Sequence, residues 1–238
     1  MKSVLITGGA NGLGKQLSLY YAKNGYKICV LDLSVGENTE NISYHRLDLA
    51  YFDVENLTFL KEPFDIVICN AGISVSGDFI KIDYEKELEV FEVNFFGHLR
   101  LMKFLLKNNF IKNEGRIAFI CSASCFFSFP IALAYAASKS ALDGFAHALE
   151  SYLIDKKISV TRVYPGPMNT AHSQYYPGAA TEGGRLPQQS VPLIVKAIEK
   201  RKRKICPDPI SLFYRILSAF IPKLLAKKAF YFYQKRIR

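Results

Sequence analysis

Six short apolar runs constrain the fold of this chain more than any other feature. They are apolar at consecutive positions rather than at alternate ones, which indicates strands buried on both faces of a sheet. Longer segments between them repeat apolar residues at helical spacing. Strands and helices that alternate in this way form a parallel sheet covered by helices on both faces. The predicted strands are Ser3–Thr7, Lys27–Leu31, Ser43–Leu47, Asp65–Cys69, Arg116–Cys121 and Ile158–Tyr164.

The whole pattern predicts an α/β fold, a three-layer doubly wound parallel sheet with a C-terminal helical extension. No linker or internal repeat interrupts the chain before about residue 165, so we expect one domain over residues 1–207. Residues 208–238 form the extension, which is not a separate domain. We expect a loop over 170–192, rich in Gly, Pro, Ser, Thr and Gln. The predicted helices are Leu13–Asn24, Val54–Leu60, Tyr84–Asn108, Ala134–Asp155 and Val191–Lys200, followed by an edge strand at Ile205–Pro207 and two helices that meet at Pro222.

A glycine-rich turn follows the first predicted strand and opens the first predicted helix. Its sequence from Thr7 to Gly14 is TGGANGLG. Glycines let the backbone approach a pyrophosphate closely, and the helix N-terminus attracts the phosphate charge. Asp32 ends the next strand, where a carboxylate can accept hydrogen bonds from ribose hydroxyls and repel a 2′-phosphate. These features predict NAD as the cofactor. The cations Lys15 and Arg46 leave NADP open, and a structural turn with a solvated Asp32 is the alternative.

Three further residues predict proton transfer beside such a dinucleotide. Tyr135 and Lys139 lie four residues apart on a predicted helix, so both project from one face. An ammonium beside a phenol favours the phenolate, and we expect Lys139 to lower the pKa of Tyr135 from its usual ~10. Ser122 ends a strand, where open α/β sheets bind ligands, and its hydroxyl can hold a substrate oxygen. The alternative is an ordinary solvated Tyr–Lys pair.

Taken together, these motifs resemble the classical short-chain dehydrogenase/reductase (SDR) family over about residues 2–200. The resemblance implies a Rossmann fold and assigns catalytic roles to Asn94, Ser122, Tyr135 and Lys139, with Asn94 holding a proton-relay water. Cys121 stands where the family often has serine. The resemblance also implies a cofactor site made by Gly8, Asn11, Gly12, Leu13, Gly14, Asp32, Asp48, Leu49, Asn70, Ala71, Gly72, Tyr135, Lys139, Pro165, Gly166 and Thr170.

The function that follows from this resemblance is reversible, NAD(P)-dependent interconversion of an alcohol and a ketone or aldehyde. Hydride passes to or from the nicotinamide, and Tyr135 is the general acid/base. The alternative is a non-catalytic dinucleotide-binding redox sensor or partner-binding module on the same fold, which would have no need of the proton-transfer residues. The resemblance further implies a homodimer or homotetramer paired through the segments 84–108 and 134–155.

The net charge of +10 is concentrated at the C-terminus. Residues 1–198 carry 19 basic and 19 acidic side chains, whereas residues 199–238 carry 12 basic and 2 acidic ones. The extension also carries an apolar stripe at helical spacing. Two interpretations stay open: the helices pack on their own protein, or they contact an anionic membrane and favour a hydrophobic substrate. Nucleic-acid binding is not expected, because no nucleic-acid motif accompanies the charge. The stripe comprises Ile210, Phe213, Leu217, Phe220 and Ile221.

The remaining chemistry-bearing residues predict no metal site. Five cysteines form no CxxC pair and lie mostly in apolar runs, where a free thiol behaves as a small hydrophobe. Four histidines show no paired spacing and are interpreted as incidental. The N-terminus has no room for a secretory apolar segment before its glycines, so we expect a cytoplasmic protein, with peripheral membrane association as the open alternative.

Overall fold

The computed structural model describes residues 1–127, 129–170 and 184–237. In this part of the chain, seven parallel strands form one sheet in the order β3-β2-β1-β4-β5-β6-β7. The order reverses between β1 and β4, and open α/β sheets bind ligands at such a point, in a crevice at the carboxyl ends of the strands. The strands are β1 (Ser3–Thr7), β2 (Lys27–Asp32), β3 (Ile42–Arg46), β4 (Phe64–Cys69), β5 (Ile111–Ile120), β6 (Ser159–Val163) and β7 (Lys204–Ile205).

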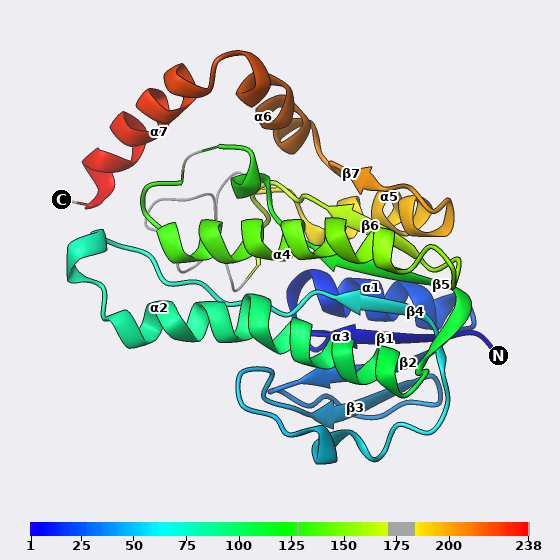
Figure 1. Cartoon of the computed structure of the whole chain (residues 1–238). Helices are drawn as coiled ribbons and strands as arrows, with labels where there is room; N and C mark the ends of the chain where they lie inside the picture. The colour runs from blue at the N-terminus through cyan, green and yellow to red at the C-terminus, as the bar shows by residue number, and fades with distance from the viewer. Residues whose placement is uncertain (128, 171–183, 238) are drawn as a thin grey trace.

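Helices cover both faces of this sheet (Figure 1). One layer contains α1 (Gly12–Lys23) and α5 (Pro187–Glu199), and the other contains α2 (Tyr84–Phe91), η3 (Glu92–Phe96), α3 (Gly97–Lys107) and α4 (Leu133–Tyr152). Three short 3₁₀ turns lie in the connections: η1 (Val54–Leu57), η2 (Phe79–Lys81) and η4 (Ala123–Cys125).

The consecutive apolar residues of the strands have a direct structural reason. Along β1, Leu5 joins the core beneath α3 and α4, whereas Val4 and Ile6 join the core beneath α1 and α5. Because successive side chains of a strand point to opposite faces, a sheet covered on both faces needs apolar residues at every position. The predicted doubly wound parallel sheet is therefore confirmed.

Several predicted boundaries change. The helix predicted over 54–60 is only the single turn η1, and the helix predicted over 84–108 contains a π-helical turn, η3, in its middle. The predicted loop over 170–192 is wrong at its end, because α5 already begins at Pro187, where proline suits the first helical turn. The edge strand β7 ends at Ile205, before the predicted Pro207. Residues 171–183 lie outside the described part of the chain.

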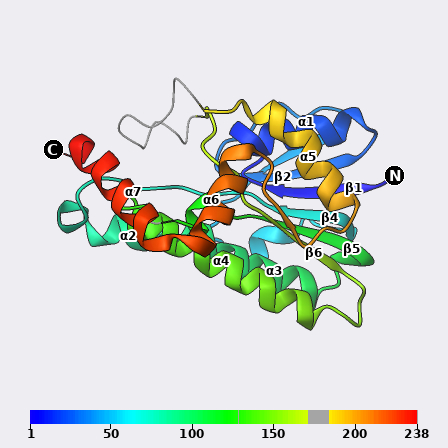
Figure 2. The ribbon, with the colours of Figure 1, turned by 90° about the horizontal axis from the view of Figure 1, so that it is seen from above.

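The C-terminal extension consists of α6 (Pro209–Phe220) and α7 (Pro222–Ile237), which meet at Pro222 as predicted. Figures 1 and 2 show these helices leaving the β7 edge of the sheet, with α7 running toward the end of the molecule where the strands terminate. None of the described helices is long and apolar enough to cross a membrane.

Candidate active site

The glycine-rich turn between β1 and α1 forms a tight cradle at the crevice. Gly8 and Gly12 have positive φ angles of 64° and 52°, which favour glycine. A Cβ on Gly14 would lie 2.0 Å from the carbonyl oxygen of Gly8, so no side chain fits there. The Asn70 amide, at the end of β4, donates hydrogen bonds to the carbonyl oxygens of Thr7 (3.1 Å) and Gly8 (2.8 Å). Asn70 therefore holds the turn in place.

The half-buried carboxylate of Asp32 lies beside the same turn. Its Oδ2 accepts a hydrogen bond from the Ala10 amide (2.9 Å), and its Oδ1 accepts one from the Ser34 amide (3.0 Å). Each carboxylate oxygen keeps lone pairs for further donors. Asp48 accepts a hydrogen bond from the Ala50 amide (2.9 Å) in the turn after β3. The structure thus places acceptors at the ends of two neighbouring strands, on the β2–β3 side of the crevice.

Two further residues predicted for the cofactor site, Thr170 and Ala71, lie beside the same cradle. The methyl carbon of Thr170 would lie 3.5 Å from a Cβ on Gly12, so Thr170 covers the turn from the segment after β6. Ala71 donates its amide hydrogen to the Thr7 hydroxyl (3.1 Å). Asn11 is exposed at the N-cap of α1, whereas Leu13 and Leu49 are buried in the cores on opposite faces of the sheet.

Tyr135 and Ser122 meet at the carboxyl end of β5. Ser122 follows the strand, and its Oγ accepts a hydrogen bond from the Ser124 amide (3.1 Å), which orients the hydroxyl. Burial raises the pKa of the Tyr135 phenol to about 12, and a hydrogen bond with Ser122 opposes this rise. The expected fall in the pKa of Tyr135 is therefore wrong as a net result, because desolvation is the largest effect on this phenol. Tyr135 is a neutral phenol at neutral pH.

Lys139 lies in the same α4 face and is buried. Its Nζ donates a hydrogen bond to the Ile120 carbonyl oxygen (2.9 Å) and lies 6.0 Å from the centre of the Tyr135 ring. Burial lowers the pKa of this ammonium, since the charged form has lost water. A Cβ on Gly72 would lie 3.0 Å from Nζ, so only glycine leaves the ammonium open on this side. The ammonium keeps donors for another partner.

Asn94 lies in the π-helical turn η3 and is fully buried. Its amide bridges two elements: it accepts a hydrogen bond from the Ile73 amide (2.8 Å), and donates to the Ile73 carbonyl (3.0 Å) and to Ser138 Oγ (2.9 Å). Ser138 donates in turn to the Tyr135 carbonyl oxygen (2.8 Å). Single π-helical turns are frequent at functional sites, and this one couples the β4–α2 connection to the helix that carries Tyr135.

His98 was not predicted to matter, and the interpretation of all four histidines as incidental is wrong for this residue. It is fully buried, with Nε2 3.0 Å from Thr7 Oγ1 and Nδ1 3.2 Å from the Asn94 carbonyl oxygen. Thr7 Oγ1 already accepts hydrogen bonds from the amides of Asn70 (2.9 Å) and Ala71 (3.1 Å). The hydroxyl hydrogen must therefore point to Nε2, which leaves Nδ1 as the protonated nitrogen that donates to Asn94.

This tautomer agrees with the electrostatics. Burial, together with the charge of Lys139, lowers the pKa of His98 to about 3. A neutral imidazole thus connects the end of β1, where the glycine turn begins, to the π-helical turn that holds Asn94. The spacing of histidines along the chain carries no sign of this contact, because Thr7 and His98 lie 91 residues apart.

Asp208 is a second residue that the sequence did not single out. Its Oδ2 accepts a hydrogen bond from the Gly166 amide (2.8 Å), and its Oδ1 accepts one from the Ser211 amide (2.7 Å) as the N-cap of α6. The Pro165 carbonyl oxygen accepts a hydrogen bond from the Ala123 amide (2.9 Å). The Pro165–Gly166 pair after β6 is thereby tied to the C-terminal extension on one side and to the Ser122 segment on the other.

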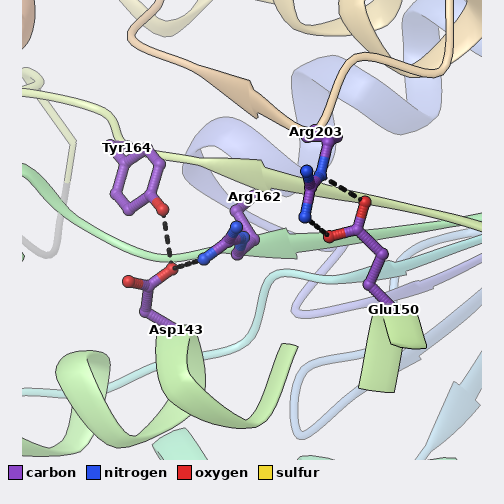
Figure 3. A network of polar contacts seen from close by, with 5 residues as sticks. All are labelled: Asp143, Glu150, Arg162, Tyr164 and Arg203. Carbon is purple, nitrogen blue, oxygen red and sulfur yellow. Dashed lines mark hydrogen bonds and ion pairs between the residues drawn. The ribbon is translucent and has the colours of Figure 1, made fainter. Parts of the chain in front are cut away.

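Polar contacts also fix α4 against the edge of the sheet (Figure 3). Asp143 accepts a hydrogen bond from the Tyr164 hydroxyl (2.6 Å) and forms an ion pair with the buried Arg162 (3.3 Å). Burial and the Asp143 charge raise the pKa of Tyr164. Two turns further along α4, Glu150 pairs with Arg203 through two contacts of 2.7 and 2.9 Å. These contacts hold the helix that positions Tyr135 and Lys139.

In the described residues, no group of three or more His, Cys, Asp or Glu side chains could hold a metal ion. The five cysteines are free and buried or half-buried, and burial raises the pKa of the Cys69 thiol. These observations agree with thiols that serve as small apolar side chains.

Comparison with known proteins gives a consistent result. A family model described as short chain dehydrogenase matches residues 2–179. The chain is 30% identical over 240 residues to the dehydrogenase/reductase SDR family protein 7-like of Anopheles gambiae, covering 88% of this chain and 76% of that protein. It is 30% identical over 185 residues to retinol dehydrogenase 8 of Homo sapiens, covering 71% and 60% of the two chains.

The fold is likewise shared with solved structures. A short chain dehydrogenase from Burkholderia cenocepacia in complex with NADP matches with a TM-score of 0.83 at 20% sequence identity. The match covers 96% of this chain and 99% of that one. At this identity, the likeness shows the arrangement of the strands and helices.

Proposed function

This chain belongs to the short-chain dehydrogenase family, and on that premise we propose that it is an NAD(P)-dependent oxidoreductase that interconverts an alcohol and a ketone or aldehyde. The observation that carries the proposal is the convergence of Ser122, Tyr135 and Lys139 beside the glycine turn. Ser122 and Tyr135 share a hydrogen bond, and Gly72, two residues after the Asn70 that holds the turn, leaves room at the Lys139 ammonium. A structural helix surface would not need a buried ammonium beside a half-buried phenol.

The residues of the crevice fit a nicotinamide dinucleotide, which supplies or accepts the hydride when bound. The cradle around Gly8 and Gly12 offers backbone amides at a helix N-terminus, which suits a pyrophosphate. Asp32 offers a carboxylate to ribose hydroxyls and repels an additional phosphate, which supports NAD over NADP. The buried Lys139 ammonium keeps donors for a second ribose.

The protonation states indicate how the side chains act in the direction of carbonyl reduction. Tyr135 carries its proton on Oη at neutral pH and donates it to the substrate oxygen, where negative charge develops. Ser122 holds the same oxygen through its hydroxyl. Lys139 stabilises the phenolate that remains, because its charge lies close to the Tyr135 ring. Asn94 holds the turn η3 against Ile73 and α4, and we propose that it also positions a water for proton return.

We propose a hydrophobic small-molecule substrate. Aromatic side chains lie four to seven residues after Ser122, with Phe126 packed 4.6 Å from Tyr164 and Phe127 6.0 Å from Phe129, measured between ring centres. One relative of the chain is named a retinol dehydrogenase, which supports an apolar alcohol as the substrate class.

The proposal extends to the assembly and the location of the protein. We assign residues 1–207 to the catalytic domain and 208–238 to its helical extension. Exposed apolar side chains on the helices α2 to α4, among them Leu88, Phe96 and Leu133, support a homodimer or homotetramer paired through this layer. We propose a cytoplasmic enzyme in peripheral contact with an anionic membrane through the extension.

The test is a turnover assay on the purified full chain, with a panel of short and long-chain alcohols, ketones and aldehydes and with both cofactors. We expect turnover that falls at least about a hundredfold in Tyr135→Phe, which removes the proton donor. Tyr152→Phe, at an exposed position of the same helix, is the matched control and should keep full activity. Cofactor binding without turnover of any compound would refute the proposal and favour a redox sensor.

A further inference from the structure

Helix α6 exposes apolar side chains and buries a polar one, the opposite of what a helix that only packs on its own protein does. Several of its apolar side chains point into solvent: the exposed fractions of Phe213, Ile216 and Phe220 are 55%, 52% and 79%. The residue that it buries is polar, since Ser211 is fully enclosed and donates hydrogen bonds to Asp208. Surface helices normally bury the apolar face and expose the polar one. An exposed apolar stripe of this kind marks an interaction surface.

Helix α7 follows α6 directly and exposes both apolar and basic side chains. Leu225 is its buried anchor, whereas Leu224 and Tyr231 are exposed. Lys227 and Lys228 are exposed beside them, and neither forms an ion pair with a carboxylate in the part of the chain that the structure describes. Long lysine side chains can lay their methylene groups along an apolar surface while the ammonium reaches water or phosphate.

The extension is held to the body in a defined orientation. Tyr214 of α6 stacks on Phe127 with 4.3 Å between ring centres, and Tyr233 of α7 contacts Phe129 edge-on at 5.4 Å. The Asp208 cap ties the start of α6 to Gly166. The two interpretations that the sequence left open are therefore compatible: one face of the extension packs on the protein, and the other face stays free for a partner.

Charge identifies the kind of partner. Residues 209–238 carry seven basic side chains and no acidic one. A two-fold contact with a second copy would bring two such surfaces together, and like charges facing each other across an interface oppose binding. An anionic lipid surface is complementary, since phosphates meet the lysines while aromatic and aliphatic side chains enter the boundary between headgroups and acyl chains.

We propose that the outer face of α6 and α7, defined by Phe213, Ile216, Phe220, Lys227 and Lys228, docks the protein onto an anionic lipid bilayer. Phe127 and Phe129, which support the extension, belong to the segment that follows Ser122. Docking therefore places the bilayer beside the substrate side of the site. This second step rests on the proposed function: an apolar alcohol or ketone would reach the site from the membrane rather than from water.

The test measures vesicle binding by the full chain, without turnover, so that its failure is separate from failure of the proposed activity. Vesicles contain phosphatidylcholine alone or with about one third phosphatidylserine. We expect co-sedimentation with the anionic vesicles that weakens as salt is added. Lys227→Gln with Lys228→Gln should weaken binding about twenty-five-fold, at about 1 kcal/mol for each charge near the surface. Phe213→Ser with Phe220→Ser should weaken it at least about tenfold.

Matched controls separate the surface from general effects. Lys200→Gln with Lys202→Gln removes two exposed charges in the turn after α5, and Tyr152→Ser with Ile154→Ser removes two exposed apolar side chains at the end of α4. Both controls should bind vesicles as the wild type does. Equal binding to neutral and anionic vesicles would overturn the proposal. So would a phenylalanine variant that binds vesicles normally but changes from dimer to monomer, which would identify the face as a contact between copies.

Discussion

Replacing His98 by glutamine tests whether the buried imidazole is neutral, as its contacts require. The pKa of His98 in the folded protein is about 3, against an ordinary value of 6.5. A lowered pKa means that the unfolded chain binds more protons than the folded one between these two pH values. The contribution of His98 to stability is therefore complete above pH 6.5 and is lost as the pH falls toward 3. The wild type should lose stability on mild acidification for this reason alone.

The size of the effect follows from the two pKa values. Between pH 7 and pH 5, protonation of His98 in the unfolded state lowers the free energy of unfolding by about 2 kcal/mol. The variant His98→Gln has no imidazole at this position, so its free energy of unfolding does not fall for this reason. At pH 7, however, His98→Gln should be about 1–3 kcal/mol less stable than the wild type, because the Thr7 hydroxyl or the Asn94 carbonyl loses its buried partner. The difference between the two proteins should thus shrink as the pH falls.

Equilibrium unfolding in guanidinium at pH 7, 6 and 5 measures this difference. The matched control is His147→Gln, at an exposed position of α4, whose unfolding curves should run parallel to those of the wild type. Other titrating groups are common to all three proteins and cancel in the comparison. If the wild type and His98→Gln lose stability in parallel from pH 7 to pH 5, the neutral imidazole and its role between β1 and η3 are refuted.

Three further substitutions test residues that form or support the candidate site. Gly14→Ala should abolish cofactor binding or folding, because the new Cβ would lie 2.0 Å from the Gly8 carbonyl oxygen. The control Gly144→Ala on α4 meets nothing within 4 Å and should raise the free energy of unfolding by about 0.5–1 kcal/mol, and thermal and guanidinium unfolding compare the two variants. Asp208→Ala should cost about 2–4 kcal/mol, since α6 loses its N-cap and the Gly166 amide loses its acceptor, and unchanged guanidinium midpoints would contradict this. Asp32→Asn should shift the ratio of NAD to NADP dissociation constants at least about tenfold toward NADP, and titration with both cofactors measures it.

The fold and much of the candidate site could be predicted from local patterns. The end of β1, the end of β4 and the end of β5 carry Thr7, Asn70 and Ser122, and parallel strands bring their carboxyl ends to one edge of a sheet. The helical spacing of Tyr135 and Lys139 likewise placed both side chains on one face. The start of α5 at Pro187 and the π-helical turn η3 were missed, because boundaries depend on packing that periodicity does not report.

By itself, the sequence determined the doubly wound sheet and the order of the motifs along it, since both follow from periodicity and from chain topology. Only the tertiary structure decided the protonation state of Tyr135, the tautomer of His98 and the direction of the apolar face of α6. The first depends on burial, which disfavours the charged form of the phenol. The second depends on hydrogen-bond partners remote in the chain, which decide which ring nitrogen accepts and which donates. For the third, helical spacing shows which residues share a face, but the contacts of Ser211 and Tyr214 with the body decide where that face points.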